Sequence, residues 1–319
     1  MNRRRLVGTI AVVGVAAGAG YAIYGDRHSF VAGLHRLGAG AVLTAFACGV
    51  VGTSATYFAW REVLGGLGVA LPVRAGSRVY FVSQLGKYLP GSVWPVLMQM
   101  EAGRAHGASR RTMFGANIVT VVLGCCTGLI VACLLLPLQD TAVIRSYWWI
   151  LITLPVLAAL LHPRALPALI DAALRVLHRP PLGQRLDVRA EARAAALFMF
   201  CWFALGLQMW ILSRSSAPAG HGGGSLYLLC TGGAALATCV GVLTIPVPAG
   251  AGVRELVMTL VLRTRMDTGA ALAVVVTARV LVTVADAGLA ALAVVIGGRG
   301  VEATGAPGPS VSGSGPDRE

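Results

Sequence analysis

The chain has 319 residues, of which 56% are hydrophobic and only 12% are charged, and its mean hydropathy is +0.74. Average soluble domains carry roughly 25% charged residues, so this composition excludes an ordinary water-soluble globule and indicates a chain whose solvent is lipid. The net charge of +13 does not indicate a nucleic-acid-binding protein, because the positive residues are spread between apolar stretches instead of gathering on one soluble face.

Seven apolar stretches are candidates for crossing a hydrocarbon core of about 30 Å, which takes about 20 residues in a helix. They cover residues 6–24, 38–60, 112–136, 146–161, 194–212, 225–245 and 268–297. Three arginines precede the first stretch, which also fits a signal peptide, but the later spans favour an uncleaved first helix. We therefore expect an all-α polytopic membrane bundle with about seven spans.

Arginine is distributed unevenly between the loops. If the N-terminus lies inside, the outer loops between spans hold only Arg27, Arg36, Arg145 and Arg214. The inner segments then hold Arg3, Arg4, Arg5, Arg61, Arg74, Arg78, Arg104, Arg110, Arg111, Arg164, Arg175, Arg179, Arg185, Arg189, Arg193, Arg254, Arg263 and Arg265. Cytoplasmic loops carry an excess of Lys and Arg, so the sequence predicts a multi-pass protein of the cytoplasmic (inner) cell membrane with its N-terminus inside.

Two stretches in the C-terminal half of the chain are not predicted to span the membrane. Residues 162–193 are basic and predicted to be cytoplasmic, and their apolar residues recur at helical spacing. This pattern is typical of an amphipathic helix on an anionic membrane surface, or of a linker helix packed on the bundle. Residues 298–319 are rich in Gly, Pro and Ser and are expected to be a disordered tail.

The segments 76–101 and 245–263 each place Pro and Gly between short apolar halves. The helix-breaking residues include Pro90, Gly91, Pro248, Gly250 and Gly252. Because Pro removes a backbone donor and Gly loosens a helix, the backbone there must be satisfied by protein or by cavity water. Two such segments in matching places of two halves are typical of a transporter site near the membrane midplane. A cytoplasmic loop with an interfacial helix is the alternative for each.

Each broken segment follows two predicted spans and precedes one, which suggests a weak internal duplication. The repeats would be 1–136 and 194–297, joined by the span 146–161 and the basic segment 162–193, within one transmembrane domain at 1–297. The arginine distribution places both broken segments on the cytoplasmic side, so we expect parallel rather than inverted repeats.

Several charged residues fall inside apolar surroundings, where a charge at mid-bilayer costs about 2.5–3.5 kcal/mol on insertion scales. Lys87 is the only lysine of the chain, and Arg279 and Asp286 lie seven residues apart on roughly one face of the last span. A compact ammonium suits a lipid phosphate, whereas chance placement is the alternative for Lys87. For Arg279 and Asp286 the alternatives are a mutual ion pair or snorkelling to an interface.

Three stretches resemble the transmembrane family named for lysylphosphatidylglycerol synthase, also called flippase-like. They are "SQLGKYLPGSVW" at 83–94, "PVPAGAGVREL" at 246–256 and "TARVL" at 277–281. The resemblance extends over roughly 6–297 and implies an integral membrane protein that handles lipids. It carries over Lys87, Tyr88, Pro90, Gly91, Trp94, Gly250, Gly252, Arg254, Glu255 and Arg279. Ala249 and Ala251 stand where the family commonly has glycine, so a stiffer second turn is expected. No soluble synthase domain follows in this sequence, so synthesis of an aminoacylated lipid is not expected.

The leading hypothesis is a lipid flippase or scramblase for an anionic phospholipid or a polyprenyl-phosphate-linked lipid. In it, Lys87, Tyr88, Arg254 and Arg279 bind the headgroup, while Glu101, Glu255 and Asp286 balance charge. One alternative is a membrane-embedded lipid-carrier transferase, although the sequence offers no DxD, no HxxxH and no carboxylate cluster. Another is a non-catalytic partner of a lipid-modifying or glycosylating membrane enzyme. We expect no catalytic residue, metal or cofactor, and the seven cysteines lie in apolar runs as packing residues.

Overall fold

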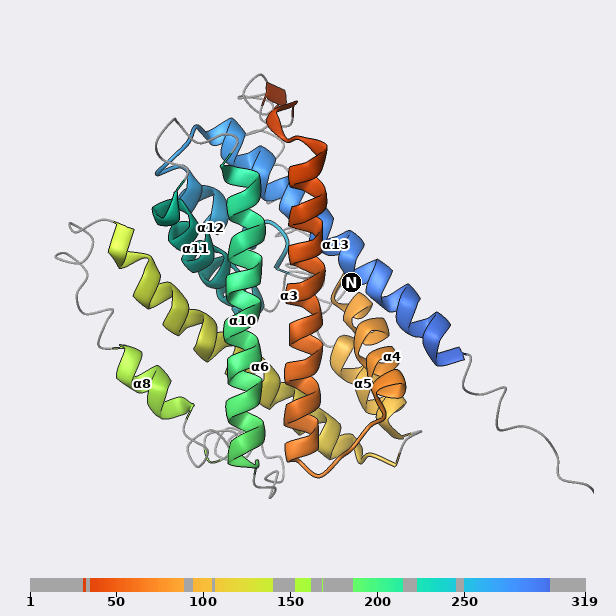
Figure 1. The fold of residues 1–319 in the computed structure, drawn as a ribbon. Coiled ribbons are helices and arrows are strands. Elements are labelled where there is room, and N and C mark those ends of the chain that lie inside the picture. The colour runs from red at the N-terminus through yellow and green to blue at the C-terminus, as the bar shows by residue number, and fades with distance from the viewer. Residues whose placement is uncertain are drawn as a thin grey trace, which may run out of the picture.

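The computed structural model describes residues 31–32, 35–88, 94–104, 107–139, 153–161, 168, 186–214, 223–244 and 250–298. In these ranges the chain is helical and contains no strand. Five helices there are long and apolar enough to cross a membrane, which confirms an all-α polytopic membrane fold (Figure 1). They are α3 (Ala39–Gly66), α6 (Arg110–Leu135), α10 (Val188–Ser213), α11 (Gly224–Leu243) and α13 (Thr268–Gly298).

Shorter helices complete the described structure. They are α4 (Val73–Gln84), the 3-10 turns η1 (Leu85–Tyr88) and η2 (Pro137–Gln139), α5 (Trp94–Arg104), α8 (Thr153–Leu160) and α12 (Val253–Leu262). The predicted span 6–24 and the tail at 299–319 lie outside the described residues, as does nearly all of 162–185. Of the predicted span 146–161, only α8 and the residue after it are described.

Helices α3 and α10 form a closely packed antiparallel pair. Gly49 of α3 lies against Gln208, and Gly66, at the other end of α3, lies against Ala190. The residue numbers therefore fall along α10 as they rise along α3. Glycine at such positions lets two helix backbones approach closely, which is a common way to pack helices where lipid removes the hydrophobic driving force.

An aromatic cluster attaches α4 to α3. The Tyr57 ring contacts Tyr80 and Phe81, with ring centroids 5.6 and 5.2 Å away. The Tyr80 hydroxyl donates a hydrogen bond to Thr56 Oγ1 at 3.0 Å, and the Tyr57 hydroxyl donates to the carbonyl of Val73 at 3.0 Å. These buried rings are hydrogen-bonded at their polar tips, as aromatic residues in cores usually are, and they fix the first broken segment on α3.

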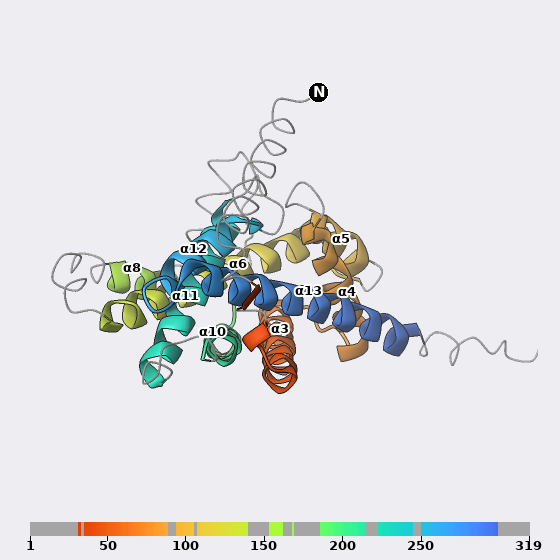
Figure 2. The same cartoon turned by 90° about the horizontal axis from the view of Figure 1, so that it is seen from above.

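The last helix, α13, runs in the same direction as α3 but is inclined across it (Figures 1 and 2). Near its start, Ala270 and Val274 belong to one apolar cluster with Ala45 of α3. Near its end, Ala290 and Ala293 belong to a second cluster, which contains the C-terminal part of α3. Helix α13 therefore contributes to the apolar core at both ends of the bundle.

The two broken segments enter the bundle from opposite ends. Helices α4 and α5, joined through η1, form a first hairpin that leaves the end of α3 and returns to the start of α6, where Gly103 lies against Met113. Helices α11 and α12 form a second hairpin, in which Gly241 of α11 lies against Arg254 of α12. Beyond α12, Arg265 Nη2 lies 3.5 Å from Ser225 Oγ at the start of α11.

These contacts correct the predicted location of residues 250–267. The arginine distribution placed Arg263 and Arg265 at the same end as Arg61, but Arg265 also contacts the carbonyl of Gln139, beyond the far end of α6. Helix α12 has ten residues and spans only about 15 Å, so it cannot cross and instead turns back. The broken segments are thus arranged in an inverted sense, and the expected parallel arrangement is wrong.

Arginine still favours one end of the bundle among the described residues. The arginine-rich end, where α3 ends and α6 and α10 begin, holds Arg61, Arg74, Arg78, Arg104, Arg110, Arg111, Arg189 and Arg193. The arginine-poor end, where α3 begins and α6 and α10 end, holds Arg36, Arg214, Arg263 and Arg265. Arg254 and Arg279 lie between the ends.

Accessibility from the two sides of the membrane tests this topology. We expect Arg104→Cys and Arg263→Cys to react with a membrane-impermeant maleimide from opposite sides of oriented vesicles. The background should have the seven native cysteines, all free thiols, replaced by alanine. Labelling of both positions from the same side would contradict the inverted arrangement.

The contact between α10 and α11 predicts that Gly206→Ala is destabilising. A Cβ atom on Gly206 would lie 2.0 Å from Thr231 Oγ1 and 2.6 Å from Thr231 Cα, and overpacking of this kind costs about 1–3 kcal/mol. The melting temperature in mild detergent measures the loss.

Gly288→Ala is the matched control, because a Cβ atom on Gly288 of α13 meets nothing within 4 Å. This control should be neutral or raise stability by up to about 1 kcal/mol, since alanine is the better helix former. Equal effects of the two substitutions would contradict the close packing of α10 on α11.

Candidate functional site

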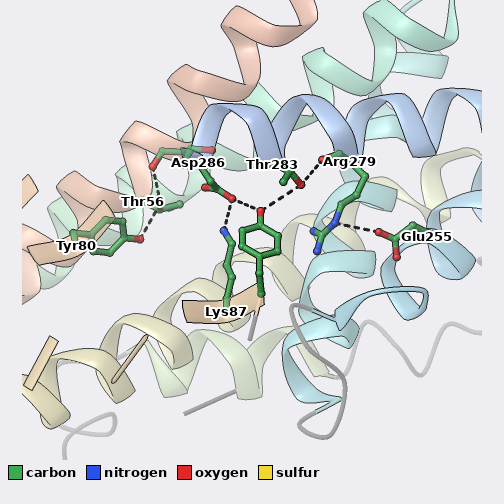
Figure 3. A network of polar contacts seen from close by, with 9 residues as sticks. Thr56, Tyr80, Lys87, Glu255, Arg279, Thr283 and Asp286 are labelled. Carbon is green, nitrogen blue, oxygen red and sulfur yellow. Dashed lines mark hydrogen bonds and ion pairs between the residues drawn. The ribbon is translucent and has the colours of Figure 1, made fainter. Parts of the chain in front are cut away.

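The tips of both hairpins meet the middle of α13, where two ion pairs form (Figure 3). Lys87 Nζ of the first hairpin lies 2.6 Å from Asp286 Oδ2, and Arg279 Nε lies 3.2 Å from Glu255 Oε1 of the second hairpin. Arg279 and Asp286 share a helix but each pairs with a different hairpin, so the mutual ion pair considered from their spacing does not form. The polarity of the two pairs is opposite.

Asp286 is the most buried member of this charged cluster. Its side chain is 2% exposed, and the same oxygen that contacts Lys87 also accepts a hydrogen bond from the Tyr88 hydroxyl at 2.6 Å. The Tyr88 hydroxyl lies 3.4 Å from Thr283 Oγ1, which in turn donates to the carbonyl of Arg279. A buried carboxylate is tolerated only when it is paired and hydrogen-bonded, and η1 supplies both partners.

The 3-10 turn η1 presents Lys87 and Tyr88 to α13 because the chain stops being an α-helix at Gln84. Gly86 is buried in this turn, and a Cβ atom there would lie 3.1 Å from Trp94 Cβ and 3.2 Å from the nitrogen of Pro95. Trp94 therefore closes the first hairpin and is not one of the charged cluster. Pro90 and Gly91 lie outside the described residues.

Glycine shapes the tip of the second hairpin. Gly250 and Gly252 have φ values of +63° and +81°, a left-handed conformation that favours glycine. The Glu255 side chain accepts a hydrogen bond from the backbone nitrogen of Gly252 at the start of α12, so one carboxylate both caps α12 and pairs with Arg279. Pro248 lies outside the described residues.

Arg254 is the cation of the cluster that has no counter-charge of its own. Its side chain lies against Gly241, and its Nε is buried with no hydrogen-bond partner in the described part of the chain. The carboxylates of Glu255 and Asp286 pair with Arg279 and Lys87. The cluster therefore holds three cations against two anions and carries one unbalanced positive charge.

A cavity of about 190 Å³ lies among these groups. Its charged lining is Lys87, Arg254, Glu255, Arg279 and Asp286, and its neutral polar lining is Thr53, Thr56, Gln208 and Thr238. The remaining lining is mostly apolar. Within the described ranges, no three His, Cys, Asp or Glu side chains gather into a metal site, so the cavity offers cations and neutral donors to a ligand.

The structure brings together most of the predicted headgroup residues and charge partners. Lys87, Tyr88, Arg254, Glu255, Arg279 and Asp286 all belong to the cluster. Glu101 does not: its side chain is 59% exposed, and it pairs with Arg104 and Arg110 away from the cavity. Sequence reasoning missed Gln208, for which the available signal was a glutamine within an apolar span.

The family model described as lysylphosphatidylglycerol synthase TM region matches residues 9–296 of the chain. The chain belongs to this family. The match includes both hairpins and all of the charged cluster, so the cavity is part of the family's own transmembrane region. A comparison with curated proteins finds no similar sequence. As a lysylphosphatidylglycerol synthase TM region member, the chain is a membrane protein of a lipid-related family.

The buried ion pair predicts a large penalty for Asp286→Asn. The substitution leaves the Lys87 ammonium without its counter-charge, and removing one partner of a buried pair costs about 3–5 kcal/mol. Thermal unfolding in mild detergent should show this loss, and Lys87→Gln in the same chain should recover part of it.

The exposed pair of Glu101 and Arg110 provides the comparison, because its side chains are 59% and 54% exposed. Arg110→Gln should cost no more than about 1 kcal/mol. Similar losses for Asp286→Asn and Arg110→Gln, or no recovery in the double variant, would contradict a stabilising role for the buried pair.

Proposed function

We propose that this protein binds the phosphate of an anionic lipid in the cavity and moves the lipid headgroup across the cytoplasmic membrane. The observation that carries the proposal is the unbalanced positive charge of Arg254, whose buried Nε has no partner among the described residues, beside a cavity at the meeting point of two hairpins. An anion in the cavity neutralises that charge and accepts the hydrogen bond that the protein leaves unmade.

Phosphate is the group that these side chains suit best. A guanidinium offers several donors in a planar fork that matches phosphate oxygens, whereas lysine acts as a point charge. The cavity has one side chain of each kind from the two hairpins, Arg254 and Lys87, and a second arginine from α13. The acyl chains would stay in the bilayer beside the apolar surface of α13, where Val280, Val284 and Leu292 are exposed.

The inverted arrangement of the hairpins supports movement of the lipid rather than static binding. A site near the midplane between two re-entrant segments is typical of transporters that open to one side at a time. One ion pair joins each hairpin to α13, Lys87 with Asp286 or Glu255 with Arg279, and the Tyr88 hydroxyl adds a hydrogen bond to Asp286 in the first hairpin. Release of one ion pair would weaken the attachment of one hairpin and leave that of the other in place.

The arginine-rich end would face the cytoplasm. This end still holds more arginines than the arginine-poor end when Arg263 and Arg265 are counted at the latter. Such an excess is typical of cytoplasmic loops. In this orientation the first hairpin enters from the cytoplasm and the second from the outer side.

Lipid bound to the purified protein tests the proposal. Arg254→Gln should retain at least about tenfold less anionic lipid than the wild type after extraction in mild detergent, because it removes the unbalanced charge. It should also slow the exchange of a labelled anionic phospholipid between the leaflets of vesicles.

Arg263→Gln is the matched control, since Arg263 is an exposed arginine directly after the same helix. It should behave as the wild type in both assays. If all three proteins retain only bulk lipid in equal amounts, the headgroup site is refuted. If lipid is retained but the leaflets exchange no faster than in empty vesicles, transport is refuted.

A further inference from the structure

The neutral part of the cavity lining contains an amide nitrogen that has no partner among the described residues. Gln208 of α10 is 1% exposed, it lines the cavity, and its Nε2 is buried with no hydrogen-bond partner in the described part of the chain. Buried polar groups are nearly always hydrogen-bonded, and an unmade bond is costly. A ligand group that accepts from this amide would remove that penalty.

Close packing holds the amide in place. A Cβ atom on Gly49 of α3 would lie 2.9 Å from Gln208 Nε2, so α3 leaves little room on that side for the amide to move. Thr53 of α3 and Thr238 of α11 add hydroxyl groups to the same cavity lining. The site thus offers neutral donors and acceptors from α3, α10 and α11 in addition to the cations of the hairpins and α13.

The charge of the cluster limits the headgroup. With the two ion pairs intact, one positive charge remains for the ligand, and a phosphodiester carries one negative charge at neutral pH. A phosphomonoester brings more negative charge than the site balances. An aminoacylated headgroup brings an ammonium, but both carboxylates lining the cavity, Glu255 and Asp286, are already paired.

The volume of the cavity limits the size of the headgroup alcohol. A cavity of about 190 Å³ equals roughly six water molecules at their share of about 30 Å³ each in the liquid. That space can hold a phosphate with a small alcohol.

Resting on the proposed function, we infer that the site selects a phosphodiester lipid whose alcohol is neutral and carries hydroxyl groups. The phosphate binds at Arg254, and a hydroxyl oxygen of the alcohol accepts a hydrogen bond from Gln208 Nε2. Gln208, together with the hydroxyl of Thr238 in the same lining, then distinguishes among anionic lipids, whereas the cations only require a phosphate.

Competition between phosphatidylglycerol and phosphatidylmethanol with the same acyl chains measures how much the hydroxyl groups of the alcohol contribute to binding. Both are singly charged phosphodiesters, and only the first carries hydroxyl groups on its alcohol. Native mass spectrometry of the purified full-length protein should show that the wild type prefers phosphatidylglycerol about tenfold. The preference should fall to nearly equal binding in Gln208→Met, which keeps the length of the side chain and removes the amide.

Two further variants sharpen the result. Phe200→Leu changes an exposed residue of the same helix that does not line the cavity, and it should keep the preference. Thr238→Val removes a hydroxyl from the same cavity lining and should lower the preference, which provides a second test if Gln208→Met fails to fold.

The outcomes separate this inference from the proposed function. Equal binding of the two lipids by the wild type, or an unchanged preference in Gln208→Met, would overturn the inference and leave the anionic-lipid site standing. Tighter binding of lysyl-phosphatidylglycerol than of phosphatidylglycerol would overturn the neutral alcohol. Binding of neither anionic lipid by the wild type would overturn the inference and the proposed function together.

Discussion

The fold depends on compensating one carboxylate, Asp286, in the middle of an apolar helix. Because its side chain is almost fully buried, an ammonium and a hydroxyl must reach it at that depth. A continuous spanning helix could supply them only from its own face. The chain instead ends α4, turns through η1 and presents Lys87 and Tyr88 together. The first hairpin is therefore the structural consequence of a charge that α13 cannot neutralise alone.

The second hairpin satisfies its own carboxylate and then adds an unpaired cation. Glu255 caps α12 and pairs with Arg279, which leaves the adjacent Arg254 without a counter-charge. A fold selected for stability alone would satisfy this guanidinium, since an unmade buried hydrogen bond is expensive. Its buried Nε and the Gln208 amide belong to residues that line one cavity. The proposed ligand would give these two residues the partners that the described part of the chain does not supply.

Hydropathy predicted the spanning helices well, because the apolar runs at 38–60 and 112–136 correspond to α3 and α6. The hydropathy pattern assigned Arg263 and Arg265 to the wrong end of the bundle. A topology that alternates from span to span treats α12 as part of a loop, because a ten-residue helix is too short to count as a span. The seven-residue spacing of Arg279 and Asp286 identified their shared face correctly, but their partners come from segments far away in the sequence. Gln208 carried no periodic signal at all, because its role depends on Gly49 across the helix pair.

The opposite polarity of the two ion pairs connects the fold to the proposed movement. Each hairpin contributes one residue to its pair, a cation at Lys87 and an anion at Glu255, and α13 contributes the complement. In the proposed function, a headgroup at Arg254 lies beside both pairs, and movement requires that one pair be released while the other stays in place. A ligand shifts a conformational equilibrium only as far as it binds one state better than another. The proposed movement therefore requires that the headgroup bind more tightly when one of the two pairs is open.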